Sequence, residues 1–457
     1  MTRISLCLIA RDEEQLLPDC LASVAAVVDE VVVVDTGSKD ATRRLAREWG
    51  ARVAQVPWND DFSVPRNAAL LLATGDFVLV LDADERLAPG SGPRLRETLD
   101  HAAFDCGMIR LHNASRLDAA PAEVVAGRAR LGPPMPLPRV LRRTPDLRYT
   151  GVVHESVSDW VAARGMRIAT LDVDVIHLGA IPEVRAQRGK SDRNLTLLRR
   201  RCELEPGSIT PFAYLALELI SHGALAEAAE VVERGWALLD TQPANISVLR
   251  LAVARGIVAV ETGAPERVLE TMGRAERTEG AQPDFFHLRG RALVLLALRA
   301  AGAERQRVLA GAESAFWGAL ALAGRESLRQ YVAGASSWAS WNGIGEVKLY
   351  LDRPVDALVA FGEALSQCPE NPEAGLGEVE ALSRTQPAQA LARVERLLDG
   401  RPDGWLLAGA AARALGAIDD ARGLVAQAMA RRHNKFRSPR RAGLLALMAS
   451  ELGVRFD

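Results

Sequence analysis

A buried strand that ends in two carboxylates constrains the fold of this chain more than any other sequence feature. Residues 77–81, Phe-Val-Leu-Val-Leu, form an apolar run typical of a strand covered on both faces. Asp82 and Asp84 follow it, and residues two apart in an extended backbone point the same way. Like charges at that spacing repel unless a cation lies between them, and carboxylate oxygens suit Mg²⁺ or Mn²⁺. We therefore expect a divalent-metal site at the carboxyl end of a central strand.

The first part of the chain alternates strand and helix patterns. Strands are predicted at residues 4–10, 30–34, 51–56 and 77–81, and helices at residues 15–28, 40–49 and 58–67. Such alternation predicts a parallel, Rossmann-like α/β sheet. The chain has neither Gly-x-Gly-x-x-Gly nor Gly-x-x-x-x-Gly-Lys-Ser/Thr, so neither a dinucleotide site nor a P-loop is predicted.

Polar residues gather where these strands end. The clusters are residues 11–14, 35–40, 66–67 and 82–84. A single Asp-x-Asp is more often an acidic turn than a metal site. Because open α/β sheets bind ligands at the carboxyl ends of their strands, four clusters at one edge favour a binding site instead.

Five motifs occur in order along this region. They are Cys-Leu-Ile-Ala-Arg-Asp-Glu-Glu (7–14), Val-Val-Asp-Thr-Gly-Ser-Lys-Asp (33–40), Trp-Asn-Asp-Asp-Phe-Ser-x-x-Arg-Asn (58–67), Ala-Thr-Gly-Asp (73–76) and Leu-Asp-Ala-Asp-Glu (81–85). The set resembles the inverting family 2 glycosyltransferases of the GT-A fold. The most similar branch carries C-terminal tetratricopeptide repeats and includes sublancin-type peptide S-glycosyltransferases and sugar transferases of surface-glycan synthesis. The resemblance covers about the first 205 residues.

The resemblance implies roles for individual residues. Ala10 and Asp12 match the loop that binds the nucleotide base, and Asp35 matches the residue that hydrogen-bonds uracil. Arg66 resembles a basic residue near the base and diphosphate. Asp82 and Asp84 match the metal-binding Asp-x-Asp, with Asp82 also next to the donor.

The chain departs from the family pattern at three places. Its first loop reads Arg-Asp-Glu-Glu where Lys-Asn-Glu-Glu is usual. Lys39 stands where a Thr is usual, and Pro65 stands where a small residue is usual. These departures bear on the choice of nucleotide, not on the fold.

A second chemical cluster is Gly151-x-x-His154-Glu155. An inverting transfer needs a base for the acceptor's proton, and the resembling family has a His-Glu pair at this place. Glu155 is therefore the candidate catalytic base, and His154 is a candidate orienting or acceptor-side residue. The alternative for Glu155 is a helix N-terminal carboxylate favoured by the helix dipole. His177 ends a strand predicted at 166–176 and is a candidate metal or diphosphate ligand, or otherwise a core histidine.

The remaining elements before residue 206 are less regular. We predict a strand at 104–111, a long acceptor-side loop at 113–138, a hairpin of 139–143 with 146–153, and helices at 156–163 and 181–205. Lys190 and Arg193, in a Lys-x-x-Arg-Asn pattern shared with the family, are candidate diphosphate or lid residues. The other arginines of the last helix are expected to be solvated.

The chain divides into two predicted domains, residues 1–205 and 206–457. The second is all-α, with tetratricopeptide-like units clearest at about 340–433 and irregular helices at 243–330. Such repeats stack into an array with a concave face, which we expect to bind a peptide or protein acceptor or to pair two chains as a homodimer. The basic residues from 431 to 441 are expected to form a solvated cap, with an acidic partner as the alternative.

Composition narrows the classes of partner. The 56 basic and 58 acidic residues nearly cancel, which argues against a nucleic-acid or membrane-surface binder. Five scattered cysteines without a Cys-x-x-Cys pair argue against a disulfide framework or zinc site. No apolar stretch is long enough to span a bilayer, and the first apolar run is too short for a signal peptide. We expect a cytoplasmic protein.

These observations predict a metal-dependent inverting glycosyltransferase that uses Mn²⁺ or Mg²⁺ and a nucleotide-sugar donor, a UDP-hexose. The expected acceptor is a peptide or protein recruited by the repeats, and an acceptor of surface-glycan or lipid-linked oligosaccharide synthesis is the alternative. A repeat scaffold with an inactive transferase domain is the alternative from another class. A nucleotidyltransferase would carry a Gly-rich first loop, which residues 10–13 lack.

Overall fold

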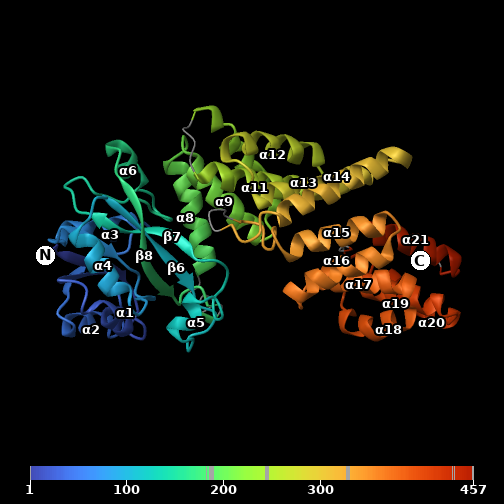
Figure 1. Ribbon diagram of the computed structural model, residues 1–457, viewed down its shortest axis with the longest axis horizontal. Coiled ribbons are helices and arrows are strands. Elements are labelled where there is room, and N and C mark those ends of the chain that lie inside the picture. Colours follow the sequence, from blue (N-terminus) through green and yellow to red (C-terminus); the bar gives the residue numbers. More distant parts are fainter. Residues whose placement is uncertain are drawn as a thin grey trace. The chain divides into compact units, whose positions relative to one another are not determined.

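The computed structural model describes residues 2–181, 183–184, 190–241, 246–325, 330–434, 436 and 438–454. The chain forms two compact units, Met1–Gly207 and Ser208–Asp457. The first unit holds a mixed sheet with helices, and the second consists of helices (Figure 1). The predicted fold class, a Rossmann-like GT-A domain followed by tetratricopeptide-like helices, is confirmed.

The described part of the first unit contains one eight-stranded sheet with the order β3-β2-β1-β4-β7-β6-β8-β5. Its strands are β1 (Ile4–Ala10), β2 (Glu30–Asp35), β3 (Arg52–Gln55), β4 (Phe77–Val80), β5 (Glu85–Leu87), β6 (Cys106–Asn113), β7 (Met135–Arg142) and β8 (Ile168–His177). Strands β3, β2, β1 and β4 are parallel, as the alternating pattern predicts. Strand β7 runs antiparallel to β4 and β6, so the sheet is mixed and not wholly parallel.

Helices cover both faces of this sheet, which explains why its strands are apolar at nearly every position. The helices are α1 (Leu17–Val24), α2 (Thr42–Glu48), α3 (Ser63–Leu72), α4 (Ser91–Asp100), α5 (Pro121–Val125), α6 (Ser158–Arg164) and α8 (Lys190–Leu204). Leu6 and Leu8 of β1 pack in one core with α1 and α4, whereas Cys7 packs in the other with α3 and α6. Parallel strands buried in this way present only their carboxyl ends to ligands.

Two expectations for this unit are wrong. Residues 139–143 do not form a hairpin with 146–153, and the expected loop at 113–138 contains α5 and the start of β7. Pro136 and Pro138 suggested a loop, because proline cannot donate a ladder hydrogen bond. Both lie where β7 pairs with β6 alone, and β4 joins only from Val140 onward. The prolines thus occupy a stretch with one neighbouring strand, where the missing donor is tolerated.

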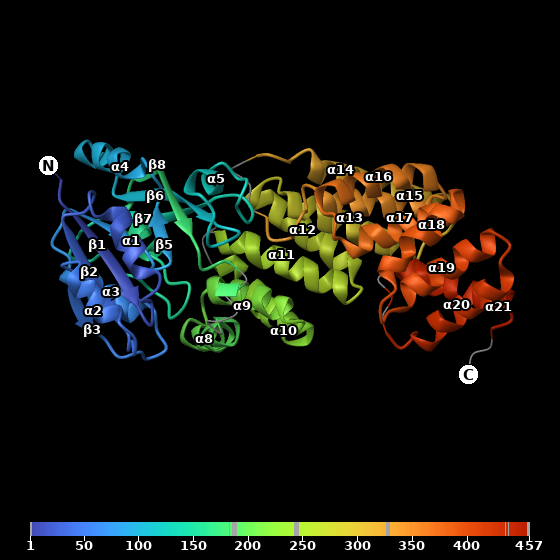
Figure 2. The same cartoon turned by 90° about the horizontal axis from the view of Figure 1, so that it is seen from below.

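The second unit consists of packed helical pairs (Figure 2). Its described α-helices are α9 (Ile209–Ser221), α10 (Leu225–Trp236), α11 (Ile246–Glu261), α12 (Pro265–Glu279), α13 (Pro283–Ala297), α14 (Gly302–Leu320), α15 (Trp338–Tyr350), α16 (Pro354–Gln367), α17 (Pro372–Thr385), α18 (Pro387–Val394), α19 (Pro402–Ala414), α20 (Ile418–Ala430) and α21 (Pro439–Glu451). Two short 3₁₀ turns, Leu239–Thr241 and Glu395–Leu397, follow α10 and α18. The helix-rich but irregular region at 243–330 contributes α11 to α14.

Small residues allow these helices to pack closely. A Cβ atom on Gly343 would lie 2.5 Å from the Phe316 ring, and one on Gly345 would lie 2.6 Å from the Phe361 ring. Both aromatic rings are almost fully buried. In these helix contacts, a small residue of one helix therefore packs directly on the aromatic ring of another. None of the helices that the structure describes is both long and apolar enough to cross a bilayer.

Candidate functional site

The loops after β1 and β2 interlock at the carboxyl edge of the sheet. Asp35 is 1% exposed, and its carboxylate accepts hydrogen bonds from the amides of Gly37 (3.1 Å) and Ser38 (3.2 Å). Asp12, at φ 54°, accepts from the Lys39 amide at 2.7 Å. The Ala10 carbonyl accepts from the Thr36 amide at 2.9 Å. These contacts join the three residues assigned to base binding into one ordered edge.

Arg66 lies at the centre of the site. It comes from α3, is buried, and donates from Nη2 to Asp82 Oδ1 at 2.6 Å and from Nε to Glu155 Oε1 at 3.0 Å. Burial opposes the charged form of Arg66, but Asp82 and Glu155 together raise its pKa well above the usual value. Three residues singled out from separate motifs therefore meet through a single guanidinium group. Its third nitrogen, Nη1, is buried without a hydrogen-bond partner.

Arg139 is a site residue that the sequence analysis missed. It lies on β7, and its Nη2 contacts Asp82 Oδ2 at 3.1 Å and also donates to Glu85 Oε1. Each oxygen of Asp82 is thus bound by a different arginine. Burial would raise the pKa of Asp82, but Arg66 and Arg139 hold it well below its usual range. Arg139 was expected in a hairpin of residues 139–143, and nothing in that expectation indicated that its side chain would reach Asp82 and Glu85.

Asp84 and His177 form a second pair beside these groups. His177 Nε2 lies 3.7 Å from Asp84 Oδ2, and its Nδ1 lies 2.7 Å from Asn113 Oδ1. Burial would lower the pKa of His177, but its contact with Asp84 raises it. A Cβ atom on Gly179 would lie 2.1 Å from Asp84 Oδ2 and 2.7 Å from His177 Nε2. Glycine therefore keeps open the space against both potential ligand atoms.

The structure does not bring Asp82, Asp84 and His177 together as one set of metal ligands. In the described ranges, no three His, Cys, Asp or Glu side chains form a group that could hold a metal ion. The reason is that the chain turns after β4, with the Glu85 amide bonded to the Asp82 carbonyl at 2.9 Å. The extended backbone assumed for Asp82-Ala83-Asp84 is absent, and Asp82 faces the two arginines.

Glu155 lies in a short loop before α6. The amides of Thr150 and Ser156 each donate to the other residue's carbonyl, at 2.9 and 3.0 Å. His154 adopts a left-handed backbone with φ 51°, and its side chain is exposed. The Glu155 carboxylate is bound by Arg66, and α6 begins only at Ser158. Helix capping is therefore not what holds this carboxylate.

Lys190 and Arg193, the two candidate residues near the end of the first unit, both belong to α8. Lys190 begins the helix, but its side chain lies outside the described residues. Arg193 is exposed, and its guanidinium lies 5.4 Å from the centre of the Phe62 ring. The expectation that the other arginines are solvated is wrong for Arg201, which is 5% exposed and bound to the loop before Glu155. Its long side chain reaches backbone carbonyls that the helical pattern could not reveal.

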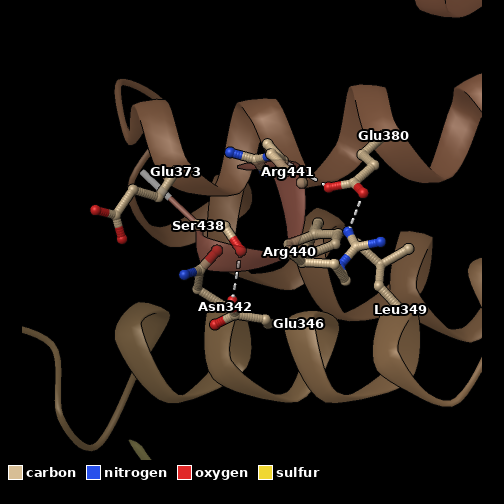
Figure 3. A pocket seen from close by; sticks show the side chains of 10 residues that line it. Asn342, Glu346, Leu349, Glu373, Glu380, Ser438, Arg440 and Arg441 are labelled. Carbon is tan, nitrogen blue, oxygen red and sulfur yellow. Dashed lines mark hydrogen bonds and ion pairs between the residues drawn. The ribbon is translucent and has the colours of Figure 1, made fainter. Parts of the chain in front are cut away.

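A separate polar cluster lies in the second unit, between α15, α17 and the start of α21 (Figure 3). Arg441 donates to Glu380 at 3.1 Å and to Asp403 at 2.9 Å, and Ser438 donates to Glu346 at 3.0 Å. Arg440 also pairs with Glu380. The expectation of a solvated cap is thus wrong for Arg441, which is 4% exposed. We assign this cluster to holding α21 against the repeats.

The first unit is similar in sequence to known proteins. Residues 5–152 match the family described as glycosyl transferase family 2. A TPR repeat-containing protein of Synechococcus elongatus is 36% identical over 254 residues, covering 53% of this chain and 59% of that protein. An uncharacterized glycosyltransferase of Rickettsia felis is 36% identical over 88 residues, covering 19% and 31%. The glycosyltransferase SunS of Bacillus subtilis is 22% identical over 204 residues, covering 44% and 45%. The chain thus spans less than two thirds of each relative's length.

Two solved structures show partial similarity to this chain. Residues 1–349 of Staphylococcus aureus TarS align with a TM-score of 0.33 and 18% identity, covering 63% of this chain and 90% of that one. A tetratricopeptide repeat protein from Parabacteroides merdae aligns with a TM-score of 0.40 and 15% identity, covering 57% and 94%.

Proposed function

We propose that this chain is a metal-dependent inverting glycosyltransferase that moves a hexose from a UDP-sugar to an acceptor. Its residues 5–152 match glycosyl transferase family 2, and helical repeats follow them. The observation that carries the proposal is the convergence of Arg66, Asp82 and Glu155 at the carboxyl edge of the sheet. These residues come from α3, from the turn after β4 and from the loop before α6. A site assembled from distant segments in this way is typical of ligand binding in open α/β folds.

The donor would lie along the edge formed by the first two strands. The uracil is assigned to Ala10, Asp12 and Asp35 by resemblance, and the hydrogen bonds that they accept from the amides of residues 36–39 support a preorganised base site. The diphosphate is assigned to the neighbourhood of Arg66. Its buried, unpaired Nη1 supports this, because a buried donor without a partner is costly and an anionic oxygen would satisfy it.

The residues that fit a divalent cation best are Asp84 and His177. A carboxylate oxygen and an imidazole nitrogen are suitable donors for Mn²⁺, and Gly179 keeps the space beside both atoms open. Asp82 is less suited to the ion, since both of its oxygens already accept hydrogen bonds from arginines. We assign it instead to the part of the site that binds the nucleotide-sugar. When bound, a divalent ion supplies positive charge against the diphosphate that leaves.

Glu155 would accept the acceptor's proton. As the acceptor oxygen or sulfur bonds to the anomeric carbon, the bond from that carbon to the diphosphate oxygen breaks and the nucleoside diphosphate leaves. The proton passes to the Glu155 carboxylate, and attack from the face opposite the leaving group inverts the anomeric centre. In this role Arg66 links the base to the donor side of the site, because it contacts both Glu155 and Asp82.

We further propose that the repeats recruit a peptide or protein acceptor, since an array of this size offers an extended surface. A glycan acceptor would leave the roles of the first unit unchanged. The acceptor class is tested by mass spectrometry of peptide and glycan mixtures incubated with the chain, the sugar donor and Mn²⁺. A sugar added to peptides only supports the proposal, and one added to glycans only contradicts this part of it.

The metal assignment predicts that Asp84→Asn weakens Mn²⁺ binding by about 100-fold or more, because even outer-shell changes cost 10- to 100-fold. Gly179→Ala is expected to act in the same direction, since its Cβ would occupy the space beside Asp84 and His177. Mn²⁺ titration followed by electron paramagnetic resonance measures this without turnover. Asp118→Asn, at an exposed carboxylate, is the matched control. Unchanged Mn²⁺ affinity in Asp84→Asn would refute the assignment.

A further inference from the structure

The loop that carries Glu155 is tied to α8 through its backbone. Arg201 donates from Nη1 to the carbonyl of Val153 at 2.6 Å and to that of His154 at 3.2 Å. Its Nε donates at 2.9 Å to Oε1 of Glu205, the residue that follows the end of α8. The guanidinium is therefore fixed on one side by the residue that follows its own helix and on the other by the two residues that precede Glu155.

The local backbone is shaped to admit this guanidinium. Gly151 has φ 94°, and a Cβ atom there would lie 2.5 Å from the Arg201 guanidinium carbon. His154 takes a left-handed conformation, which is unfavourable for a residue with a side chain and persists only where surrounding contacts enforce it. The carbonyl of His154 is one of the two that Arg201 binds. Arg201 thus holds the strained residue next to Glu155.

Helix α8 also binds the segment that precedes Arg66, the ion-pair partner of Glu155. Arg200 donates from Nη1 to the carbonyls of Asn59 and Asp60, both at 3.0 Å, in the segment that leads into α3 and Arg66. The amide of Phe62, in that segment, donates to the Val152 carbonyl at 2.9 Å. The two loops that present Arg66 and Glu155 are therefore bound to each other and to α8.

We infer that Arg201 is a positioning residue for the proposed base. It does not touch the Glu155 carboxylate. It fixes the backbone of Val153 and His154, so that the carboxylate stays within hydrogen-bonding distance of Arg66. This inference rests on the proposed function for the role of Glu155, but the hold on the loop is a property of the fold. Misplacing a reacting group by about 1 Å can cost about 100-fold in rate.

The test uses Arg201→Met and Arg201→Lys in the full chain. In Arg201→Met, kcat is expected to fall about 10- to 100-fold while KM for the donor changes less than about 3-fold. Arg201→Lys keeps the charge without the planar fork and should recover part of the loss. Arg199→Met, at an exposed arginine on the same helix, is the control. Equal activity in wild type and Arg201→Met would overturn the inference.

A double-mutant cycle with Glu155→Gln separates positioning from a general structural effect. If Arg201 acts through Glu155, Arg201→Met should change kcat by less than about 2-fold in the Glu155→Gln background. Additive losses would mean that Arg201 acts elsewhere and would contradict the inference.

Hydrogen exchange gives a readout that needs no turnover. The amides of Thr150, Ser156 and Phe62 are bonded within the two loops, so their exchange should quicken at least about 10-fold in Arg201→Met and not in Arg199→Met. Unchanged exchange of these amides in a folded Arg201→Met variant would refute the claim that Arg201 fixes the loop. Absence of turnover in the wild type would instead count against the proposed function, and the exchange result would still decide whether Arg201 fixes this backbone.

Discussion

Glu155→Gln is expected to lower kcat about 1,000-fold, within the range of 10²- to 10⁴-fold that general bases contribute. The amide retains an oxygen that can accept from Arg66 Nε, as Glu155 Oε1 does at 3.0 Å, so the loop should keep its place. It cannot take the acceptor's proton. The dissociation constant for the donor nucleotide should therefore stay within a few-fold of wild type while transfer is lost. Single-turnover kinetics with isothermal titration of the nucleotide measures both.

Glu97→Gln is the matched control for this prediction, because it makes the same change at an exposed position on α4. It should leave both kcat and nucleotide affinity unchanged. Transfer by Glu155→Gln at a rate near that of wild type would mean that another group takes the proton. Loss of nucleotide binding together with transfer would instead show that Glu155 shapes the donor site.

Arg66→Met is expected to remove activity and to lower the free energy of unfolding by about 3 to 5 kcal/mol, the usual cost of breaking a buried ion pair. The side chain of Arg66 is 8% exposed, and it contacts two carboxylates that are themselves partly or largely buried. Asp82 keeps its contact with Arg139, whereas Glu155 loses its contact with Arg66. Urea denaturation of the full chain measures the stability, with nucleotide binding as a second signal.

Three further variants identify the cause of that loss. Arg66→Lys keeps the charge but not the fork that reaches both carboxylates, so it should recover stability only in part. Arg66→Met combined with Glu155→Gln should be more stable than the sum of the single changes predicts, because the unpaired charge is gone. Arg128→Met, at an exposed arginine, should have no effect. Wild-type stability in Arg66→Met would contradict the central place given to this residue.

The parallel half of the sheet could be predicted because its signals are local. Each of β1, β2 and β4 is an apolar run followed by polar residues, and the helices between them have apolar faces of ordinary spacing. The first half of β7, up to Pro138, could not be predicted in this way. Its prolines are tolerated only because one of its edges has no neighbour until Val140, and that depends on residues far away in the chain.

In the candidate site, too, residues that belong to local motifs could be predicted, and residues that act through distant contacts could not. Arg66, Asp82 and Glu155 were found because each belongs to a recognisable motif, and the structure joins them directly. Arg139 and Arg201 were missed because they act through contacts 57 and 48 residues away, with Asp82 and Val153. The metal prediction assumed an extended backbone after β4. The turn there separates Asp82 from the Asp84–His177 pair.

The measurement that tests the central claim most directly is donor-induced stabilisation of the full chain. UDP, GDP, CDP, dTDP and UDP-sugars are each added with and without Mn²⁺, at about 100 times the dissociation constant where binding occurs. A ligand at that concentration stabilises by about 2.7 kcal/mol, which raises Tm by about 5 to 10 °C in a domain of about 200 residues. The account predicts such a rise with UDP compounds and Mn²⁺ in the wild type, and a much smaller one in Asp84→Asn. No rise with any nucleotide would contradict a working transferase site and favour a scaffold built on the helical repeats.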